Sequence, residues 1–209
     1  MLGGMAALIT VIGAMILAFT RRSHDDLVVR SSVNIATLGY ALPGSVLAVG
    51  IMLTFASMDN VLLTMARLIG LQTPGQILTG SVFALVIAYV VRFLAVAYGP
   101  IDSGLGRIRA SIAEAARGLG SSPAATLWRI YLPLLRPGLF TAALLVLVDV
   151  MKEMPATMLL RPFGWDTLAV RIYEMTSEGE WERAALPAIT LILVGLIPVI
   201  VLVRRSSKH

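Results

Sequence analysis

Hydrophobic positions along the chain gather into five long runs that are separated by polar segments. Each run is close to the about 20 residues that an α-helix needs to cross a hydrocarbon core of about 30 Å. The pattern predicts an all-α membrane protein with five transmembrane helices, organised as a single transmembrane unit over residues 1–209. The runs are Met1–Thr20, Ile35–Met58, Thr79–Ala97, Gly138–Leu160 and Ala184–Val203.

Composition agrees with this prediction. The chain is 57% hydrophobic and 14% charged, whereas soluble domains average about 45–50% apolar and about 25% charged residues. These values exclude a disordered chain and argue against a water-soluble enzyme. The sequence contains no cysteine, which excludes disulfide frameworks, thiolate zinc sites and cysteine nucleophiles.

The basic residues predict the orientation in the membrane. Outside the apolar runs, most of them fall in residues 21–34, in residues 98–137 and in the tail after Val203. Five alternating spans place these three segments on one side, and the side rich in Arg and Lys is normally cytoplasmic. We therefore expect a multi-pass membrane protein with its N-terminus outside and its C-terminus inside. The net charge of +5 then reflects orientation, and no nucleic-acid partner is expected.

The first run has a second interpretation, as a signal peptide. No basic residue precedes it, and Arg21 and Arg22 follow it, which is the reverse of the signal-peptide order. We favour a membrane span. The chain also starts inside an apolar run, which suggests a truncated or split reading frame.

Two segments on the outer side contain helix signals. Asn60 is expected to cap a short surface helix that runs to about Leu71. Asp166 is expected to cap a helix that runs through about Ser177, followed by the acidic run 178–182. The acidic run is a candidate contact for basic residues of a partner.

The polar stretch between the third and fourth runs predicts two short helices with a break. Gly120 supplies the left-handed position that ends the first helix. Ser122 is expected to cap the second helix, with Pro123 at its first position. This second helix is expected to stop before Pro133 and to turn Tyr131, with Leu127 and Ile130, toward the membrane. The segment is interpreted either as a compact knob that a partner grips or as a plain amphipathic connector.

The same stretch resembles the EAA loop of binding-protein-dependent ABC importer permeases. The shared pattern is Glu-Ala-Ala, three residues, Gly, nine residues and Ile-x-Leu-Pro. The resemblance implies a type I (MetI-like) permease architecture in a bacterial inner membrane. It also implies that residues 114–133 form the coupling helix, which docks in a groove of the ABC ATPase dimer. The motif positions, and thus the expected ATPase-coupling residues, are Glu114, Ala115, Ala116, Gly120, Ile130, Leu132 and Pro133.

Two further segments, residues 34–50 and 148–174, resemble the ferric-iron branch of these permeases. The likeness covers nearly the whole chain but only the C-terminal half of such proteins. It implies a second permease half, either encoded separately or within a longer protein, and ferric iron delivered by a periplasmic binding protein. Thiamine, a polyamine or an inorganic anion are the alternative solutes, and a non-transporting membrane scaffold is the alternative function.

Three charged residues fall inside the fourth run: Asp149, Lys152 and Glu153. At 1.5 Å per residue they lie about 17–22 Å from the start of the run, where an unpaired charge costs about 2.5–3.5 kcal/mol. One hypothesis is that the carboxylates line the translocation path and offer oxygen ligands or a negative field to a cation. The other is a self-neutralising Asp149–Lys152 pair with a structural Glu153. Arg92, in the third run, is expected to extend toward the cytoplasmic end of its span.

The sequence offers no catalytic machinery of its own. A Walker A loop requires Gly-Lys-Ser/Thr, and the two lysines, Lys152 and Lys208, follow Met and Ser. ATP hydrolysis, with its Mg²⁺, is therefore expected from a separate subunit, and this chain is expected to bind no cofactor. The two histidines, His24 and His209, are far apart in the sequence and indicate no metal site, and no metal ligand is assigned.

Overall fold

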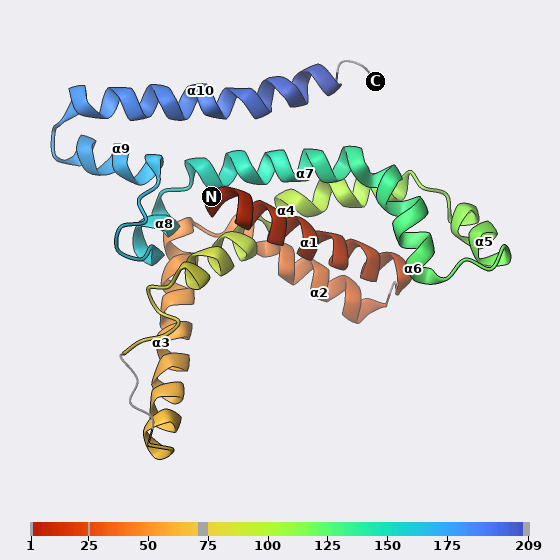
Figure 1. Ribbon diagram of the computed structural model, residues 1–209, viewed down its shortest axis with the longest axis horizontal. Coiled ribbons are helices and arrows are strands. Elements are labelled where there is room, and N and C mark those ends of the chain that lie inside the picture. The colour runs from red at the N-terminus through yellow and green to blue at the C-terminus, as the bar shows by residue number, and fades with distance from the viewer. Residues whose placement is uncertain (1, 25, 71–74, 207–209) are drawn as a thin grey trace.

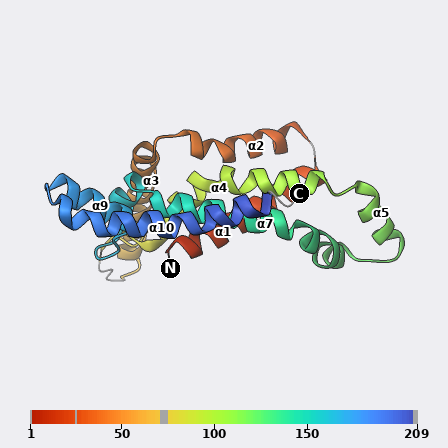
Figure 2. The ribbon, with the colours of Figure 1, turned by 90° about the horizontal axis from the view of Figure 1, so that it is seen from above.

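The computed structural model describes residues 2–24, 26–70 and 75–206, and this part of the chain folds into helices joined by turns. Three long helices form its centre: α1 (Leu2–Ser23), α4 (Val82–Gly106) and α7 (Leu132–Lys152). They pack side by side as a bundle (Figure 1, Figure 2). The buried hydrophobic residues gather mainly within this bundle.

Small residues on α1 allow the bundle to pack closely. Ala6, Thr10, Ala14 and Ala18 repeat at every fourth position and are at most 1% exposed. Residues four apart share one face of a helix, and small residues at such positions let helices in membranes approach one another. The large buried side chains of the bundle come mainly from α4, with Tyr89 among the most deeply buried.

Glycine sets the distance between α4 and α7. A Cβ at Gly138 would lie 2.8 Å from the carbonyl oxygen of Pro100, and one at Gly104 would lie 3.0 Å from Leu135. The two helices therefore pack backbone to backbone in antiparallel register. Pro100 itself lies inside α4, so this span runs on to Gly106 and beyond the predicted end at Ala97.

The predicted second span is broken in two. α2 (Leu27–Thr37) and a 3-10 turn, η1 (Leu38–Ala41), come first, and α3 (Gly44–Leu68) follows. Proline lacks the N–H that continues a helix and keeps its predecessor out of the helical region, so the break falls at Pro43. α3 then leaves the bundle and points away from it (Figure 1).

The short surface helix predicted from Asn60 is wrong, because α3 continues through Asn60 without a break. The predicted end of that helix, Leu71, lies outside the described residues. The neighbouring Asp59 is fully buried and accepts hydrogen bonds from the backbone N–H groups of residues 77–79 at 2.8–3.1 Å. This carboxylate ties the segment before α4 to the side of α3.

The predicted fourth span, Gly138–Leu160, is wrong at both ends. α6 (Pro123–Thr126), a π-helical turn η2 (Leu127–Tyr131) and α7 form one uninterrupted helix. In η2 the N–H of Leu132 bonds to the carbonyl of Leu127, and this wider turn carries the helix past Pro133. α7 then ends at Lys152, and α8 (Pro155–Leu160) starts anew at Pro155.

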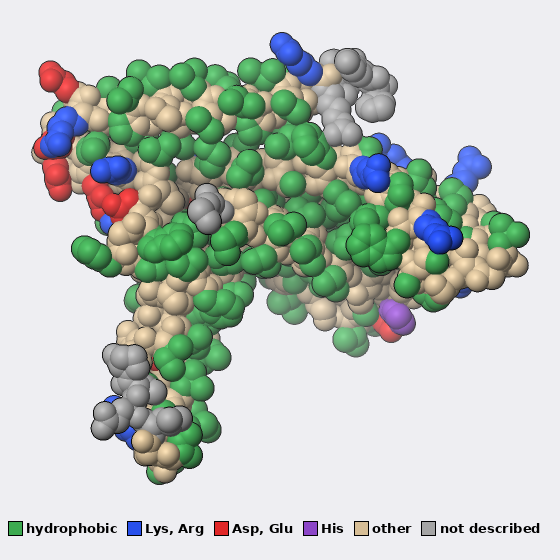
Figure 3. All heavy atoms as spheres, in the orientation of Figure 1, with side chains coloured by type: hydrophobic (Ala, Val, Ile, Leu, Met, Phe, Trp, Pro, Cys, Tyr) green, Lys and Arg blue, Asp and Glu red, His purple; other side chains and the backbone are tan. Residues whose placement is uncertain are grey.

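The remaining helices are α5 (Ala110–Gly118), α9 (Leu168–Ser177) and α10 (Trp181–Ser206). Among the described residues, five helices are long and apolar enough to cross a membrane, which confirms the predicted number of spans. α3 and α10 keep most of their apolar side chains exposed, and Figure 3 shows hydrophobic atoms along both helices. The five helices are Leu2–Ser23, Gly44–Leu68, Val82–Gly106, Pro123–Lys152 and Trp181–Arg204.

Candidate functional site

The first candidate site is an arm at one end of the bundle, which we call the α5–α6 arm (residues 107–131; Figure 1). Its two helices are separated by Gly120, whose φ of +81° confirms the predicted left-handed position. The N–H of Ser121 bonds to the carbonyl of Ala116 at 3.0 Å, which closes the end of α5. A side chain at Gly120 would strain this turn.

The start of α6 is also as predicted. The Ser122 hydroxyl accepts a hydrogen bond from the N–H of Ala125 at 3.2 Å, and Pro123 occupies the first helical turn. The predicted stop before Pro133 is wrong, because the helix continues into α7. Tyr131 packs edge-on against Phe19 of α1, with ring centroids 5.2 Å apart, so it faces a neighbouring helix and not lipid.

Arg22 of α1 fastens the base of the arm. Its guanidinium donates hydrogen bonds to the carbonyl of Ile108, at 2.6 Å, and to the carbonyl of Leu105. The same group lies 5.4 Å from the centre of the Tyr131 ring. The Arg22 side chain thus contacts both the segment that enters the arm and the helix that leaves it. The sequence marked Arg22 only as a flanking charge, because partners more than 80 residues away leave no local signal.

The residues of the EAA motif are spread over the arm. Ala116 is buried, Ile130 and Leu132 are half-buried, and the other motif residues are exposed. An open hollow of about 540 Å³ lies between α5, α6 and the end of α1, with Arg22, Glu114 and Arg117 in its wall.

The outer side of the arm carries large apolar side chains. Leu119 is 87% exposed and Trp128 is 68% exposed. Both flank the turn around Gly120 and Ser122, one before it and one after it. Exposed apolar groups on a polar segment are typical of a contact surface for another protein.

The second candidate site is a group of charges where α7 ends. Arg92 lies near the middle of α4, and its Nε is 3.0 Å from Oε2 of Glu153. The expectation that Arg92 extends to the cytoplasmic end is therefore wrong. Its Nη1 donates to the carbonyl of Leu42 at 2.7 Å, next to the break before α3. Both Arg92 and Glu153 have side chains that are mostly buried.

Glu153 connects several chain segments. Its Oε1 accepts a hydrogen bond from the N–H of Ala156, at the start of α8, at 3.2 Å. A Cβ at Gly44 would lie 2.5 Å from the same oxygen. The hydroxyl of Thr157 donates to the Glu153 carbonyl at 2.7 Å and lies 2.6 Å from the Tyr89 hydroxyl. The Arg92–Glu153 pair thus clasps the start of α3, the middle of α4 and the α7–α8 break.

Asp149 and Lys152 form a second ion pair one turn away. Their Oδ1 and Nζ atoms are 2.7 Å apart, and the Lys152 side chain is 64% exposed while that of Asp149 is 12% exposed. The structure therefore brings Asp149 and Lys152 together, as spacing indicated. Glu153 turns to Arg92 because α7 ends at Lys152. Within the described residues, no group of three or more His, Cys, Asp or Glu side chains could hold a metal ion.

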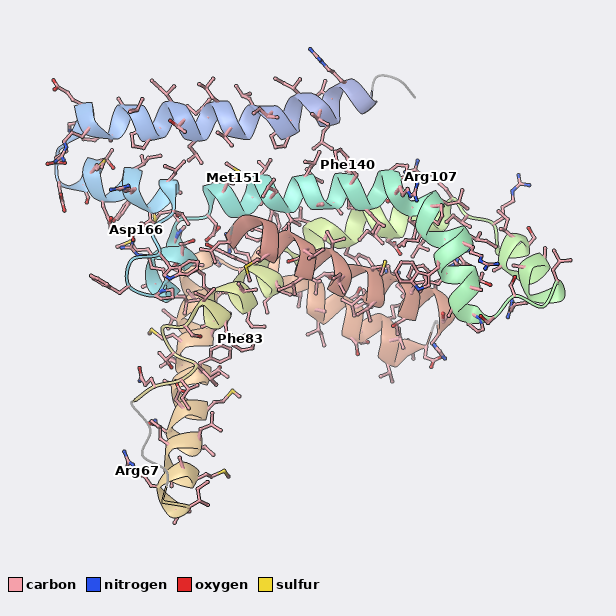
Figure 4. The ribbon with its side chains drawn as sticks, viewed as in Figure 1. Arg67, Phe83, Arg107, Phe140, Met151 and Asp166 are labelled. Carbon is pink, nitrogen blue, oxygen red and sulfur yellow. The ribbon has the colours of Figure 1, made fainter. Side chains whose placement is uncertain are left out.

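A third group of ion pairs lies at the end of the structure opposite the arm. Arg161 pairs with Asp166 and also with Glu174 of α9. α9 begins after Thr167, whose hydroxyl accepts from the N–H of Val170. The predicted helix is thus confirmed, but its cap is Thr167 because Arg161 engages Asp166. Figure 4 shows Asp166 in the loop before α9.

Residues 10–206 match the family described as "Binding-protein-dependent transport system inner membrane component". The chain is 34% identical over 131 residues to the Salmonella typhimurium protein named 2-aminoethylphosphonate transport system permease protein PhnV, covering 63% of this chain and 49% of the relative. It is 26% identical over 207 residues to the Fe(3+)-transport system permease protein FbpB 2 of Haemophilus influenzae, covering 99% of this chain and 38% of the relative.

A ferric transport system permease protein FbpB of Actinobacillus pleuropneumoniae is 25% identical over 191 residues, covering 91% of this chain and 26% of the relative. The chain therefore spans about half the length of the PhnV protein and less of the FbpB proteins. The family match includes the α5–α6 arm and both intramembrane ion pairs. The protein belongs to the family of binding-protein-dependent transport system inner membrane components.

Proposed function

We propose that this chain is a transmembrane permease subunit of an ATP-driven ABC importer and that the α5–α6 arm is its contact with the ATPase. The arm carries this proposal: it projects from the bundle, Arg22 fixes its base, and Leu119 and Trp128 are exposed on it. The motif residues Glu114, Ala115, Ala116, Gly120, Ile130, Leu132 and Pro133 all lie within or directly after the arm. ATP and Mg²⁺ belong to the separate ATPase dimer in this proposal, and the permease chain binds neither.

The helix that leaves the arm supports a route for transmitting motion. Residues 123–152 form one continuous helix from the arm to the Asp149–Lys152 pair. A rigid helix moves as a unit, so closure of the ATPase dimer at the arm would displace the charged end. Alternating access through such rigid-body movement is a known class of transition.

The proposed topology places the arm and the C-terminus in the cytoplasm and the N-terminus outside, in a bacterial inner membrane. The α9–α10 turn then faces the periplasmic binding protein. Figure 3 shows acidic side chains at that end, and Glu180 there pairs with Arg183 at 2.8 Å. A second permease half would cover the exposed apolar faces of α3 and α10, and lipid would cover the rest.

The relatives support two candidate solutes. FbpB proteins match over nearly the whole chain and favour ferric iron, whereas PhnV proteins match at higher identity over a shorter segment and favour 2-aminoethylphosphonate. In this proposal Asp149, Lys152 and Glu153 belong to, or border, the translocation path.

The experiment that tests the ATPase contact compares Gly120→Val with Gly118→Val. Both positions have open space where a Cβ would stand, but only Gly120 has a positive φ. Valine at Gly120 is expected to distort the turn at a cost of about 1–2 kcal/mol, and so to reduce co-purification of the ATPase and ATP-dependent uptake. Gly118→Val is the matched control and should retain both.

Uptake that persists in Gly120→Val, with normal ATPase binding, would overturn the assignment of the arm. Persistent membrane insertion with no ATPase binding in the unsubstituted protein would favour a scaffold instead of a transporter.

A further inference from the structure

The Lys152 ammonium group is the exposed charge of the cluster that it forms with Asp149, Glu153 and Arg92. It follows Met151, which Figure 4 labels at the end of α7. Its side chain is 64% exposed, whereas that of its partner Asp149 is 12% exposed and that of Glu153 is 7% exposed. The charge that this cluster offers to its surroundings is therefore positive.

The position of the cluster along the bundle excludes a simple surface lysine. Arg92 lies about 15 Å from the start of α4 and about 21 Å from its end, at 1.5 Å per residue. Glu153, the residue after Lys152, contacts Arg92 directly. Lys152 pairs with Asp149, one turn back toward the middle of α7. Its ammonium group is therefore directed back along the helix and away from the end of α7. Lysine at such depth faces a water-filled cavity or another protein and not lipid.

Both carboxylates of the cluster are already engaged. Glu153 accepts hydrogen bonds from Arg92 and from the N–H of Ala156, and Asp149 holds Lys152. A cation entering from the exposed side would meet the Lys152 charge first and would be repelled. This arrangement fits the hypothesis of a self-neutralising Asp149–Lys152 pair with a structural Glu153 better than the hypothesis of free carboxylates in the path.

The ammonium group keeps hydrogen-bonding capacity for a ligand. It has three N–H donors, and one of them points to Asp149. Lysine is a common point-charge ligand for phosphate oxygens.

We infer that Lys152 forms an anion-binding position in the translocation path. This inference rests on the proposed permease function and narrows its substrate class. The solute passes as an oxyanion: a phosphonate, or ferric ion only inside a complex of negative net charge. Asp149 positions the ammonium group, and the Arg92–Glu153 clasp holds the surrounding helix ends.

The test uses proteoliposomes that contain the complete transporter with its ATPase and its binding protein. Two labelled anions serve as probes, 2-aminoethylphosphonate and ferric citrate, and the probe that moves distinguishes the two sources of oxyanion. Lys152→Gln is expected to lower ATP-dependent uptake about ten-fold or more, as for loss of one charge-assisted hydrogen bond. Lys152→Arg should retain most uptake because it keeps the charge. Arg67→Gln is the control: it removes a distant charge at the far end of α3 (Figure 4) and should leave ATP-dependent uptake unchanged.

A double variant separates anion binding from a structural role. Lys152→Gln with Asp149→Asn removes both charges and leaves no unpaired carboxylate. Anion binding predicts that the double variant stays as poor as Lys152→Gln; recovery of uptake would mean that the pair is only structural and would overturn the inference. Unchanged or faster uptake in Lys152→Gln would also overturn it, since a cation path gains from loss of the positive charge.

The outcomes for the unsubstituted transporter keep the two proposals apart. ATP hydrolysis that depends on the loaded binding protein, without movement of either anion, overturns the anion inference alone. Absence of both binding-protein-dependent ATP hydrolysis and ATP-dependent uptake overturns the proposed function.

Discussion

Two ion pairs lie one turn apart in the same membrane region, and they differ in how far their side chains are exposed. Arg92–Glu153 is mostly buried, and its atoms also bond to Leu42 and Ala156 on two other segments. Asp149–Lys152 lies within a single helix, and its lysine is mostly exposed. The first pair holds breaks in the chain together, whereas the second presents a charge. Intramembrane charges adjacent in sequence can therefore have separate tasks.

The largest effect is expected from breaking the buried pair. Arg92→Met leaves the Glu153 carboxylate buried without its cation, which typically costs about 3–5 kcal/mol. The variant should show a large fall in the thermal unfolding temperature of the purified protein in detergent. Adding Glu153→Gln should recover part of this loss. An unfolding temperature equal to that of the original protein would show that the clasp contributes little.

A smaller effect is expected from a methyl group pushed into the clasp. Gly44→Ala would place its Cβ 2.5 Å from Oε1 of Glu153, and crowding of this kind costs about 1–3 kcal/mol. Gly50→Ala is the matched control, since it lies in the same helix with open space around its Cβ. Thermal unfolding of the two variants should separate them. Equal stability would mean that α3 shifts freely at its start.

The smallest effect on stability is expected at Lys152. The Lys152 side chain is 64% exposed, so Lys152→Gln should cost less stability than Arg92→Met. The double variant Lys152→Gln with Asp149→Asn leaves no unpaired carboxylate and should unfold at nearly the same temperature as the original protein. Anion uptake should nevertheless fall, as described above. A stability loss as large as that of Arg92→Met would erase the difference between the two pairs.

Much of the fold could be predicted from hydrophobic run lengths. The number of spans, the Gly120 turn and the Ser122 cap all follow from local preferences, and the structure confirms them. The predicted helix boundaries are wrong where the effect of a proline depends on the structure around it. Pro100 and Pro133 lie within continuous helices, whereas Pro43 and Pro155 mark breaks. Whether a neighbouring turn can absorb the missing N–H is decided by packing.

The partners of the site residues could not be predicted for a different reason. Arg92 and Glu153 are 61 residues apart, and Arg22 and Ile108 are 86 residues apart. Helical spacing brings Asp149 and Lys152 together, but it carries no information on contacts between helices. The EAA pattern identified the arm, and only the tertiary structure identified what anchors it.

The stripe of small residues on α1 has a mechanical consequence. Ala6, Thr10, Ala14 and Ala18 repeat with similar size at every fourth position, so α1 offers its neighbours nearly the same surface after an axial shift of one turn, about 5.4 Å. Packing in this stripe therefore defines the spacing of the helices more strongly than their axial alignment. The hydrogen bonds of Arg22 to the carbonyls of Leu105 and Ile108, and that of Arg21 to the Tyr98 hydroxyl at 3.1 Å, supply that alignment. The arginine pair at the end of α1 therefore acts as the axial stop of the first span.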